Sequence, residues 1–215
     1  MMSDLSWLKA LQQQVRLKCH ASSVLGCADL SQLPAAKLAL TPDETACYQS
    51  QLLFGLKRAN LWCLGRFALK QVLAHFGESL ETSDVIFPHP RWSIAHTQGF
   101  AMAIGIDADG LGVGIDVEIK RPFLNQWAPF YLNKKEQSRL FEWALTPETQ
   151  SDALREAWCL KEALFKATLN NKTGLDLIDF EIADNRLSAI GHNKHFACLH
   201  AQYQDYDLAF ATALK

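Results

Sequence analysis

Two carboxylates stand two residues apart in a segment with the alternation of a β-strand. Between residues 112 and 119, apolar residues alternate with Gly112, Gly114, Asp116 and Glu118. Alternate residues of a strand share a face, so Asp116 and Glu118 lie roughly 7 Å apart on one face. Carboxylates so placed raise each other's pKa unless a cation lies between them, and their hard oxygens suit magnesium. The glycines leave room for a ligand near the backbone. The pattern also fits a solvated strand face with lysine partners.

A second group of polar residues follows a helical spacing. Trp158, Glu162 and Lys166 are four residues apart and form one stripe of a predicted helix. A carboxylate and a lysine one turn apart could hold a metal ion and a phosphate together. The alternative is an ordinary surface ion pair, worth a few tenths of a kcal/mol.

Other cationic and titratable residues fit a phosphate site. His96 ends a predicted strand just before a turn, where an imidazole can donate a hydrogen bond to a phosphate oxygen. Arg58 and Arg66 share a stripe of another predicted helix with Trp62, which suggests a phosphate-binding edge with aromatic cover. A structural turn residue and a solvated helix face are the respective alternatives.

The bulk composition is that of a globular protein. The chain has 215 residues, of which 49% are hydrophobic and 20% charged, with a formal net charge of −2. That charge gives no general attraction to nucleic acid or to an anionic membrane. The six cysteines are scattered without a CxxC pair, and the N-terminus has no signal-peptide pattern. We therefore expect a cytoplasmic protein with no nucleic-acid or membrane partner. Phosphate-loop, dinucleotide-loop and serine-hydrolase motifs are absent from the sequence.

The elements that must position these side chains are predicted in the order helices, strands, helices, strands. Capping boxes at Thr41 and Asn133 begin two of the helices, and Gly77 ends another. Strands are predicted over 84–87, 92–95, 100–106, 111–119 and within 178–213. Residues 62–70 and 158–166 match weakly, with tryptophan, cysteine, leucine and lysine coinciding. We expect an α+β fold of two similar halves, 1–110 and 111–215.

Taken together, these segments resemble the 4′-phosphopantetheinyl transferase superfamily, specifically its surfactin-synthetase-activating type. The segment GIDVE at 114–118 is similar to the family's G-I-D-x-E strand, and WCLKEALFK at 158–166 to its W-x-x-K-E-A-x-x-K helix. SIAHT at 93–97 resembles its histidine segment, and FYLNKKE at 130–136 its F-F-(S/T)-x-x-E helix start. Gly65-Arg66 resembles a first-half G-R pair. The sequence departs from the pattern at Ala95, and Phe87-Pro88-His89-Pro90 replaces the family's glycine-lysine-proline.

The resemblance implies a pseudo-dimer of two α+β halves with the active site in the cleft between them. It also implies transfer of 4′-phosphopantetheine from coenzyme A to a carrier-protein serine, with release of adenosine 3′,5′-bisphosphate. Magnesium would be held by Asp116, Glu118 and Glu162. Lys166 and His96 would contact phosphate. Glu162, Glu118 or a metal-bound water would accept the serine proton.

The remaining expectations are less specific. Lys161 is a further candidate for phosphate or substrate contact, and Arg58 and Arg66 are candidates for the coenzyme's 3′-phosphate. Phe130, Tyr131 and the basic helix start after them would contact an acidic acyl or peptidyl carrier protein. We expect a monomer. Carriers of fatty-acid, polyketide, polyunsaturated-lipid, siderophore and nonribosomal peptide biosynthesis all fit. The alternatives are a non-catalytic coenzyme A or carrier-protein binding module, an unrelated magnesium-dependent phosphotransferase, and a structural interaction protein.

Overall fold

The fold is α+β, as expected, in a computed structural model that describes residues 6–169, 175, 179–183, 186–191 and 194–214. The helices are α1 (Ser6–Lys18), α2 (Leu33–Leu38), α3 (Pro42–Leu52), α4 (Leu56–Phe76), α5 (Lys134–Trp143) and α6 (Pro147–Thr168), with 3-10 helices η1 (Leu30–Gln32) and η2 (Asn125–Phe130). The strands are β1 (Val24–Asp29), β2 (Trp92–Thr97), β3 (Phe100–Gly105), β4 (Val113–Ile119), β5 (Asp179–Ala183), β6 (Arg186–Gly191), β7 (Lys194–Tyr203) and β8 (Tyr206–Ala213). No helix of the described residues is long and apolar enough to cross a membrane.

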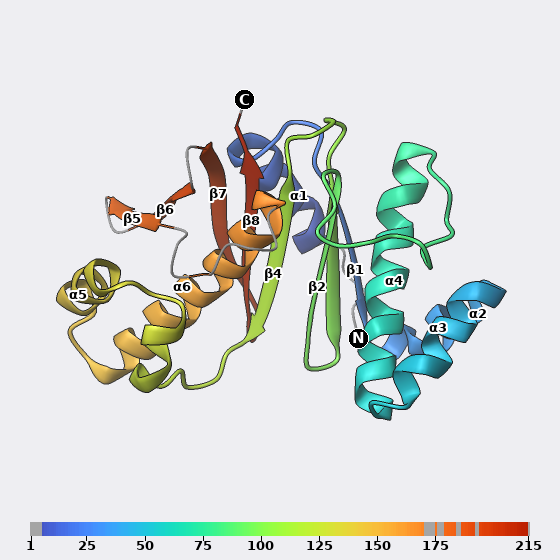
Figure 1. Cartoon of the computed structure of the whole chain (residues 1–215), viewed down its shortest axis with the longest axis horizontal. Coiled ribbons are helices and arrows are strands. Elements are labelled where there is room, and N and C mark those ends of the chain that lie inside the picture. The colour runs from blue at the N-terminus through green and yellow to red at the C-terminus, as the bar shows by residue number, and fades with distance from the viewer. Residues whose placement is uncertain (1–5, 170–174, 176–178, 184–185, 192–193, 215) are drawn as a thin grey trace.

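Within the described residues the strands form two antiparallel sheets that share a connectivity. The first has the order β1-β3-β2 and the second β4-β8-β7-β6-β5. In each, the first strand pairs with the last of its half and a long helix crosses the sheet. Helix α4 packs on the first sheet and α6 on the second, on the two outer sides of the molecule in Figure 1. Strands β2 and β4 lie side by side without backbone pairing. The Ser93 hydroxyl accepts a hydrogen bond from the Ile115 backbone N–H (3.2 Å) and joins them.

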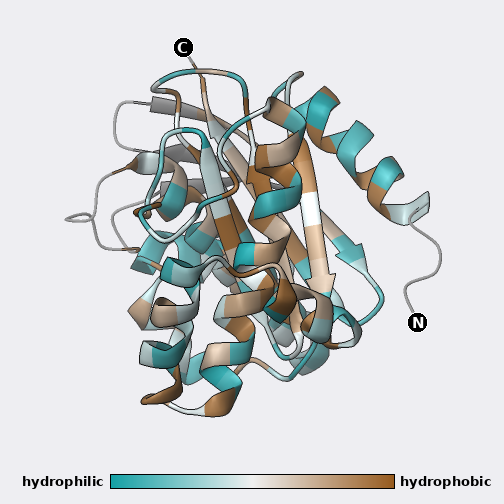
Figure 2. Cartoon of the chain, turned by 90° about the vertical axis from the view of Figure 1, so that its right-hand side faces the viewer, coloured by the Kyte–Doolittle hydropathy of each residue, from teal (hydrophilic) through white to brown (hydrophobic). Residues whose placement is uncertain are grey.

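Three apolar clusters account for the core. One lies under α4, one lies under α6, and the third is shared by the two sheets and α1. The shared cluster includes Leu11 and Val15 of α1. Figure 2 shows apolar residues along the central strands and a mixture of apolar and polar residues along the helices. Because both sheets contribute to one cluster, the two halves are joined by packing as well as by the chain.

The predicted element boundaries are mostly confirmed. The capping boxes at Thr41 and Asn133 are present, and Gly77 ends α4 with a φ of 68°. The strand predicted over 84–87 is wrong, because this segment consists of turns and bends. The carbonyls of Thr82 and Val85 accept hydrogen bonds from the Arg66 side chain, so side-chain contacts hold this segment. Strand β1 and helix α2 were not predicted.

Candidate active site

Strand β4 packs directly against α6 through its glycines. A Cβ at Gly114 would lie 1.7 Å from the Ala163 carbonyl oxygen, and one at Gly112 would lie 2.1 Å from that of Ala167. The expectation that these glycines leave room for a ligand is therefore corrected, because α6 fills the space. Close packing here sets the next residues of the same strand face, Asp116 and Glu118, beside the helix stripe predicted to carry the site.

Asp116 is buried and paired with Lys166. The Lys166 ammonium donates to Asp116 Oδ1 (2.8 Å) and to the Ile115 carbonyl oxygen (2.9 Å). Burial lowers the pKa of Lys166, but the Asp116 carboxylate outweighs it and the net shift is upward. Asp116 Oδ2 is buried and, among the described residues, has no hydrogen-bond partner. That oxygen can accept a donor or a cation.

Glu118 is held by α6 from the side. The Trp158 indole N–H donates to Glu118 Oε1 (2.9 Å), and Arg121 lies 3.9 Å from Oε2. Burial raises the pKa of Glu118 and the Asp116 charge raises it further, against the effect of the Trp158 hydrogen bond. The Trp158 side chain also packs edge-on against Tyr131, with ring centroids 5.1 Å apart. Trp158 thus orients a carboxylate in addition to packing the helix.

Glu162 and Lys166 of α6 line a cavity of about 330 Å³. Burial raises the pKa of Glu162; Lys166 opposes the shift and Asp116 adds to it. Other walls come from β2 and from the segment before it. The lining residues are Phe87, Pro88, Ser93, Ile94, Glu162, Phe165 and Lys166. Phe87, Pro88, Ser93, Ile94 and Phe165 were not predicted to line a cavity.

The three carboxylates predicted to bind magnesium influence one another electrostatically. Even so, no group of three His, Cys, Asp or Glu side chains in the described part of the chain is close enough to hold a metal ion. The Lys166 ammonium and the Trp158 indole hold one oxygen each of Asp116 and Glu118. The donor set nevertheless has the chemistry of a magnesium site, because it offers hard oxygens and one buried oxygen that lacks a partner.

His96 lies near this group at the end of β2. Burial of the ring by surrounding protein lowers the pKa of His96, and the charges of Lys166 and Arg58 contribute to the lowering. The ring is therefore neutral at neutral pH and can donate one N–H. Arg58 is exposed near the start of α4, stacked 4.7 Å from the Phe54 ring centroid. The structure thus brings Lys166 and Arg58 within electrostatic reach of His96.

Arg66 is half-buried, and its guanidinium is held by contacts within the protein. Its Nη1 donates to the Thr82 carbonyl oxygen (2.8 Å), and its guanidinium lies between the rings of Trp62 and Phe87. Burial lowers the pKa of Arg66. Phe87 lines the cavity, so Arg66 lies behind the cavity wall.

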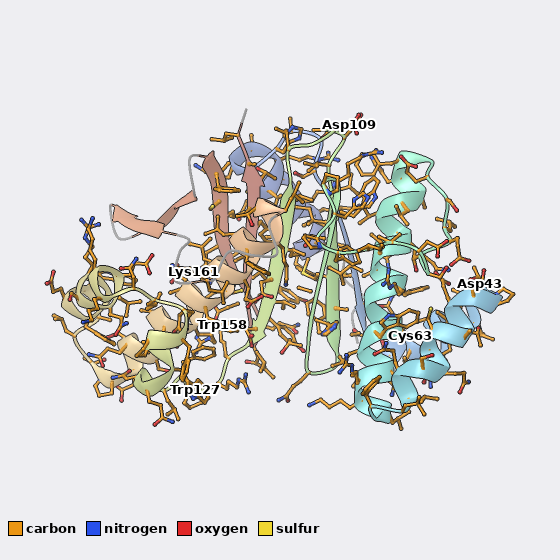
Figure 3. The ribbon with its side chains drawn as sticks, in the orientation of Figure 1. Asp43, Cys63, Asp109, Trp127, Trp158 and Lys161 are labelled. Atoms are coloured by element: carbon orange, nitrogen blue, oxygen red, sulfur yellow. The ribbon has the colours of Figure 1, made fainter. Side chains whose placement is uncertain are left out.

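The expectation for Lys161 is wrong. Its side chain is fully buried, and the ammonium donates to both oxygens of Glu136 (2.8 and 2.9 Å) and to the Leu175 carbonyl oxygen. Figure 3 labels it on α6. An ammonium so enclosed holds the start of α5 against α6, and it has no access to a phosphate.

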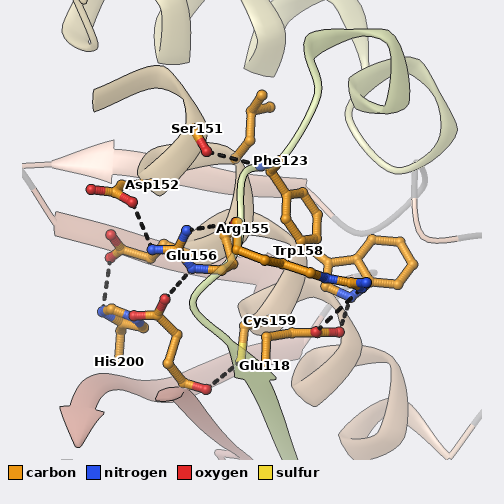
Figure 4. A network of polar contacts seen from close by, with 12 residues as sticks. Glu118, Phe123, Ser151, Asp152, Arg155, Glu156, Trp158, Cys159 and His200 are labelled. Atoms are coloured by element: carbon orange, nitrogen blue, oxygen red, sulfur yellow. Dashed lines mark hydrogen bonds and ion pairs between the residues drawn. The ribbon is translucent and has the colours of Figure 1, made fainter. Parts of the chain in front are cut away.

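A polar network beside Glu118 ties α6 to β8 (Figure 4). Buried Arg155 pairs with Asp207 and Asp152 and donates to the Arg121 carbonyl oxygen (3.1 Å). Asp207 lies opposite Glu118 in the strand pairing and also contacts His200 (3.1 Å). This network was not predicted, because its members are scattered along the sequence.

A second, aromatic cavity of about 250 Å³ lies on the other side of Glu118. It is lined by Glu118, Arg121, Phe123, Trp127, Phe130, Tyr131 and Trp158. Phe130 is 77% exposed, but Tyr131 is fully buried, with its hydroxyl donating to the Leu154 carbonyl oxygen. The expectation that Tyr131 contacts a partner protein is therefore corrected, whereas Phe130, Lys134 and Lys135 are at the surface.

The part of the chain that carries these carboxylates matches a known protein family. Residues 112–211 match the 4′-phosphopantetheinyl transferase superfamily. The matching region contains Asp116, Glu118, Glu162 and Lys166. His96, Arg58 and Arg66 precede it. No curated protein matches the chain.

Solved structures similar to this chain align with about half of it. Holo-[acyl-carrier-protein] synthase from Thermotoga maritima is 22% identical, with a TM-score of 0.42, over 49% of this chain and 64% of that one. The synthase from Neisseria meningitidis is 18% identical, with a TM-score of 0.39, over 48% of this chain and 98% of that one. The chain thus spans 64% of the length of the Thermotoga protein.

Proposed function

We propose that this chain is a 4′-phosphopantetheinyl transferase of the surfactin-synthetase-activating type. It would move the 4′-phosphopantetheine group of coenzyme A onto a serine of an acyl or peptidyl carrier protein and release adenosine 3′,5′-bisphosphate. The observation that carries the proposal is the ion pair between Asp116 and Lys166, which lines one cavity together with Glu162, within the region that matches the superfamily. Glu118 is close enough for the charges of Asp116 and Glu162 to shift its pKa. Shared strand order supports the idea that the two halves form a pseudo-dimer divided near residue 110.

Asp116, Glu118 and Glu162 would hold a magnesium ion in this proposal. Asp116 Oδ2, buried and without a partner among the described residues, is the oxygen most in need of a cation. When bound, magnesium would offset the negative charge that develops on the phosphate oxygens. Because burial disfavours the charged forms of Glu118 and Glu162, a cation there would also relieve an unfavourable charge.

The protein's own cations would position the coenzyme. Lys166 lies at the cavity and would neutralise the pyrophosphate on the leaving-group side. His96, neutral at neutral pH, would donate a hydrogen bond to a phosphate oxygen. Exposed Arg58 would meet the 3′-phosphate at the cleft edge.

Glu162 is the favoured proton acceptor. It lines the cavity, so its carboxylate can reach a serine hydroxyl that enters there. Glu118, by contrast, already accepts a hydrogen bond from Trp158. The carrier serine would lose its proton to Glu162 as its oxygen attacks the pantetheine-side phosphorus. An acidic carrier would be steered by Lys134 and Lys135 beside Phe130.

The test is intact-mass spectrometry of apo carrier proteins incubated with this protein, coenzyme A and magnesium. We expect a mass gain of one phosphopantetheine arm, lost for Asp116→Ala and without magnesium. No gain on several carriers, with coenzyme A binding still measurable by calorimetry, would identify a binding module without catalysis. Turnover of a simple phosphoester without a carrier would point to another phosphotransferase.

A further inference from the structure

The segment between α4 and β2 forms one wall of the cavity. Phe87 and Pro88 of this segment line the cavity opposite Glu162 and Lys166 of α6. The segment has no regular structure, and it precedes the region that matches the superfamily. Something other than strand pairing must therefore fix this wall.

Thr82 is the point at which the segment is anchored. It is fully buried, and all three of its polar groups are satisfied by two charged side chains. Its N–H and hydroxyl donate to Glu44 Oε1, the former at 3.0 Å. Its carbonyl oxygen accepts from Arg66 Nη1 (2.8 Å). Two side chains from α3 and α4 thus hold one residue of the wall segment from both sides.

Glu44 is itself rigidly placed. Its side chain is fully buried, it completes the capping box of α3 by accepting from the Thr41 N–H (2.9 Å), and it pairs with Lys70 of α4 (2.6 Å). Burial raises the pKa of Glu44, but hydrogen bonds from Lys70, Thr82 and Thr41 outweigh it and the net shift is downward. An ionised, charge-assisted acceptor in fixed helices makes a strong anchor.

Arg66 extends the anchor to the cavity wall itself. Its Nη1 also approaches the Val85 carbonyl oxygen (3.5 Å), and its guanidinium carbon lies 5.4 Å from the Phe87 ring centroid. The same carbon lies 5.3 Å from the ring centroid of Trp62, on α4 itself. The guanidinium is therefore a spacer between α4 and Phe87, with little freedom to turn toward a ligand.

We propose that Glu44 and Arg66 are positioning residues that hold the Phe87–Pro88 wall at the right distance from Glu162 and Lys166. Arg66 then sets coenzyme affinity through the wall and makes no contact with the 3′-phosphate. This inference rests on the proposed function, in that the cavity is taken to bind coenzyme A.

The experiment compares the binding of coenzyme A and 3′-dephospho-coenzyme A by calorimetry, for wild type, Arg66→Gln and Glu44→Gln. For both variants we expect about tenfold weaker binding, by the same factor for the two ligands. Lys57→Gln, an exposed neighbour on α4, is the matched control and should bind as wild type does. Arg66→Lys should recover part of the loss, because lysine can donate to the Thr82 carbonyl.

A loss confined to coenzyme A in Arg66→Gln would overturn the proposal, because it would show contact with the 3′-phosphate. Unchanged binding in both variants would overturn it as well. If Glu44→Gln fails to fold, Thr82→Val removes one donor of the same anchor and should weaken both ligands equally. Wild type that binds neither ligand would instead refute the proposed function.

Discussion

At the scale of single residues, the site is a set of charges whose burial opposes their ionisation. Glu118 and Glu162 both have raised pKa values, and Asp116 has a buried oxygen without a partner in the described part of the chain. Ionisable groups whose pKa values are shifted by burial and by neighbouring charges are common at functional sites. Trp158 donates a hydrogen bond to one oxygen of Glu118, and Lys166 donates one to an oxygen of Asp116. The second oxygen of each carboxylate is the one available to a cation.

Glu162→Gln should stabilise the metal-free protein at neutral pH. A folded-state pKa raised above the unfolded value means that stability from this group is fully present below about pH 4 and is lost as pH rises through the folded pKa. Glutamine carries no charge, so the variant does not lose this stability as the pH rises. We expect a Tm higher by about 2–4 °C at pH 7 without magnesium, and no difference near pH 4.

Magnesium should reverse this order. Wild type should gain Tm with added magnesium by mass action, whereas Glu162→Gln should gain little. Glu142→Gln, an exposed site on α5, serves as the control. If Glu162→Gln melts below wild type at pH 7 without metal, the partners of Glu162 stabilise its charged form, and the prediction is wrong.

Trp158→Phe should weaken magnesium binding while leaving the fold intact. Phenylalanine retains the aromatic packing against Tyr131 but removes the indole donor from Glu118. Loss of a residue that orients a ligand carboxylate typically costs about 10–100-fold in metal affinity. The concentration of magnesium for half-maximal transfer should rise accordingly. Trp127→Phe, in the same aromatic cavity, should leave it unchanged; an equal effect in both variants would refute this role.

At the scale of elements, close backbone packing between β4 and α6 sets how the side chains of the strand align with those of the helix. Gly114 of β4 lies against the Ala163 carbonyl, and Gly26 of β1 lies against that of Ala68 in the same way. A glycine in the first strand of each half thus lets the long helix approach. The contact between Gly114 and Ala163 fixes where Glu162 and Lys166 of α6 lie along β4 relative to Asp116.

Gly114→Ala should be severely destabilising. The new Cβ would overlap a backbone carbonyl at 1.7 Å, which cannot be relieved by a side-chain rotation. We expect a loss of more than about 3 kcal/mol in the free energy of unfolding, measured with urea. Gly110→Ala is the control, since its Cβ meets open space and only the positive φ of 73° is penalised, by about 1–2 kcal/mol. Equal losses in the two variants would contradict direct strand–helix contact.

At the scale of the whole molecule, the two halves share a core. Leu25 and Met102 of the first sheet belong to the same buried cluster as Ile115 and Phe210 of the second. The predicted division at residue 110 therefore separates sequence halves whose apolar faces cover each other.

The full chain should accordingly unfold in one cooperative step. Calorimetric and van't Hoff enthalpies should agree, because opening either half exposes the shared cluster. Residues 111–215 alone should show no monomeric cooperative transition. Two resolved transitions in the full chain, each reproduced by one isolated half, would show that the halves fold independently.

Local patterns in the sequence determined much of the fold. The capping boxes at Thr41 and Asn133, the C-terminal Gly77 and the alternation before Glu118 all depend on a few neighbouring residues, and the structure agrees with them. Strand β1 escaped prediction because it is short and Gly26 interrupts its apolar run. Its partner, the Ala68 carbonyl, is distant in sequence. The signal that would have found β1 is its likeness to β4, with a glycine near the start of each.

Only the tertiary structure decided which charged residues reach the cavity. The sequence marks Lys161 and Lys166 alike as lysines of one helix, but one is enclosed with Glu136 and the other meets Asp116. Arg66 and Glu44 became wall anchors because Thr82 folds back between them. Residue type and spacing determine what chemistry is possible. Burial and partners contributed by distant segments determine which side chains can perform it, because they set each group's exposure and charge.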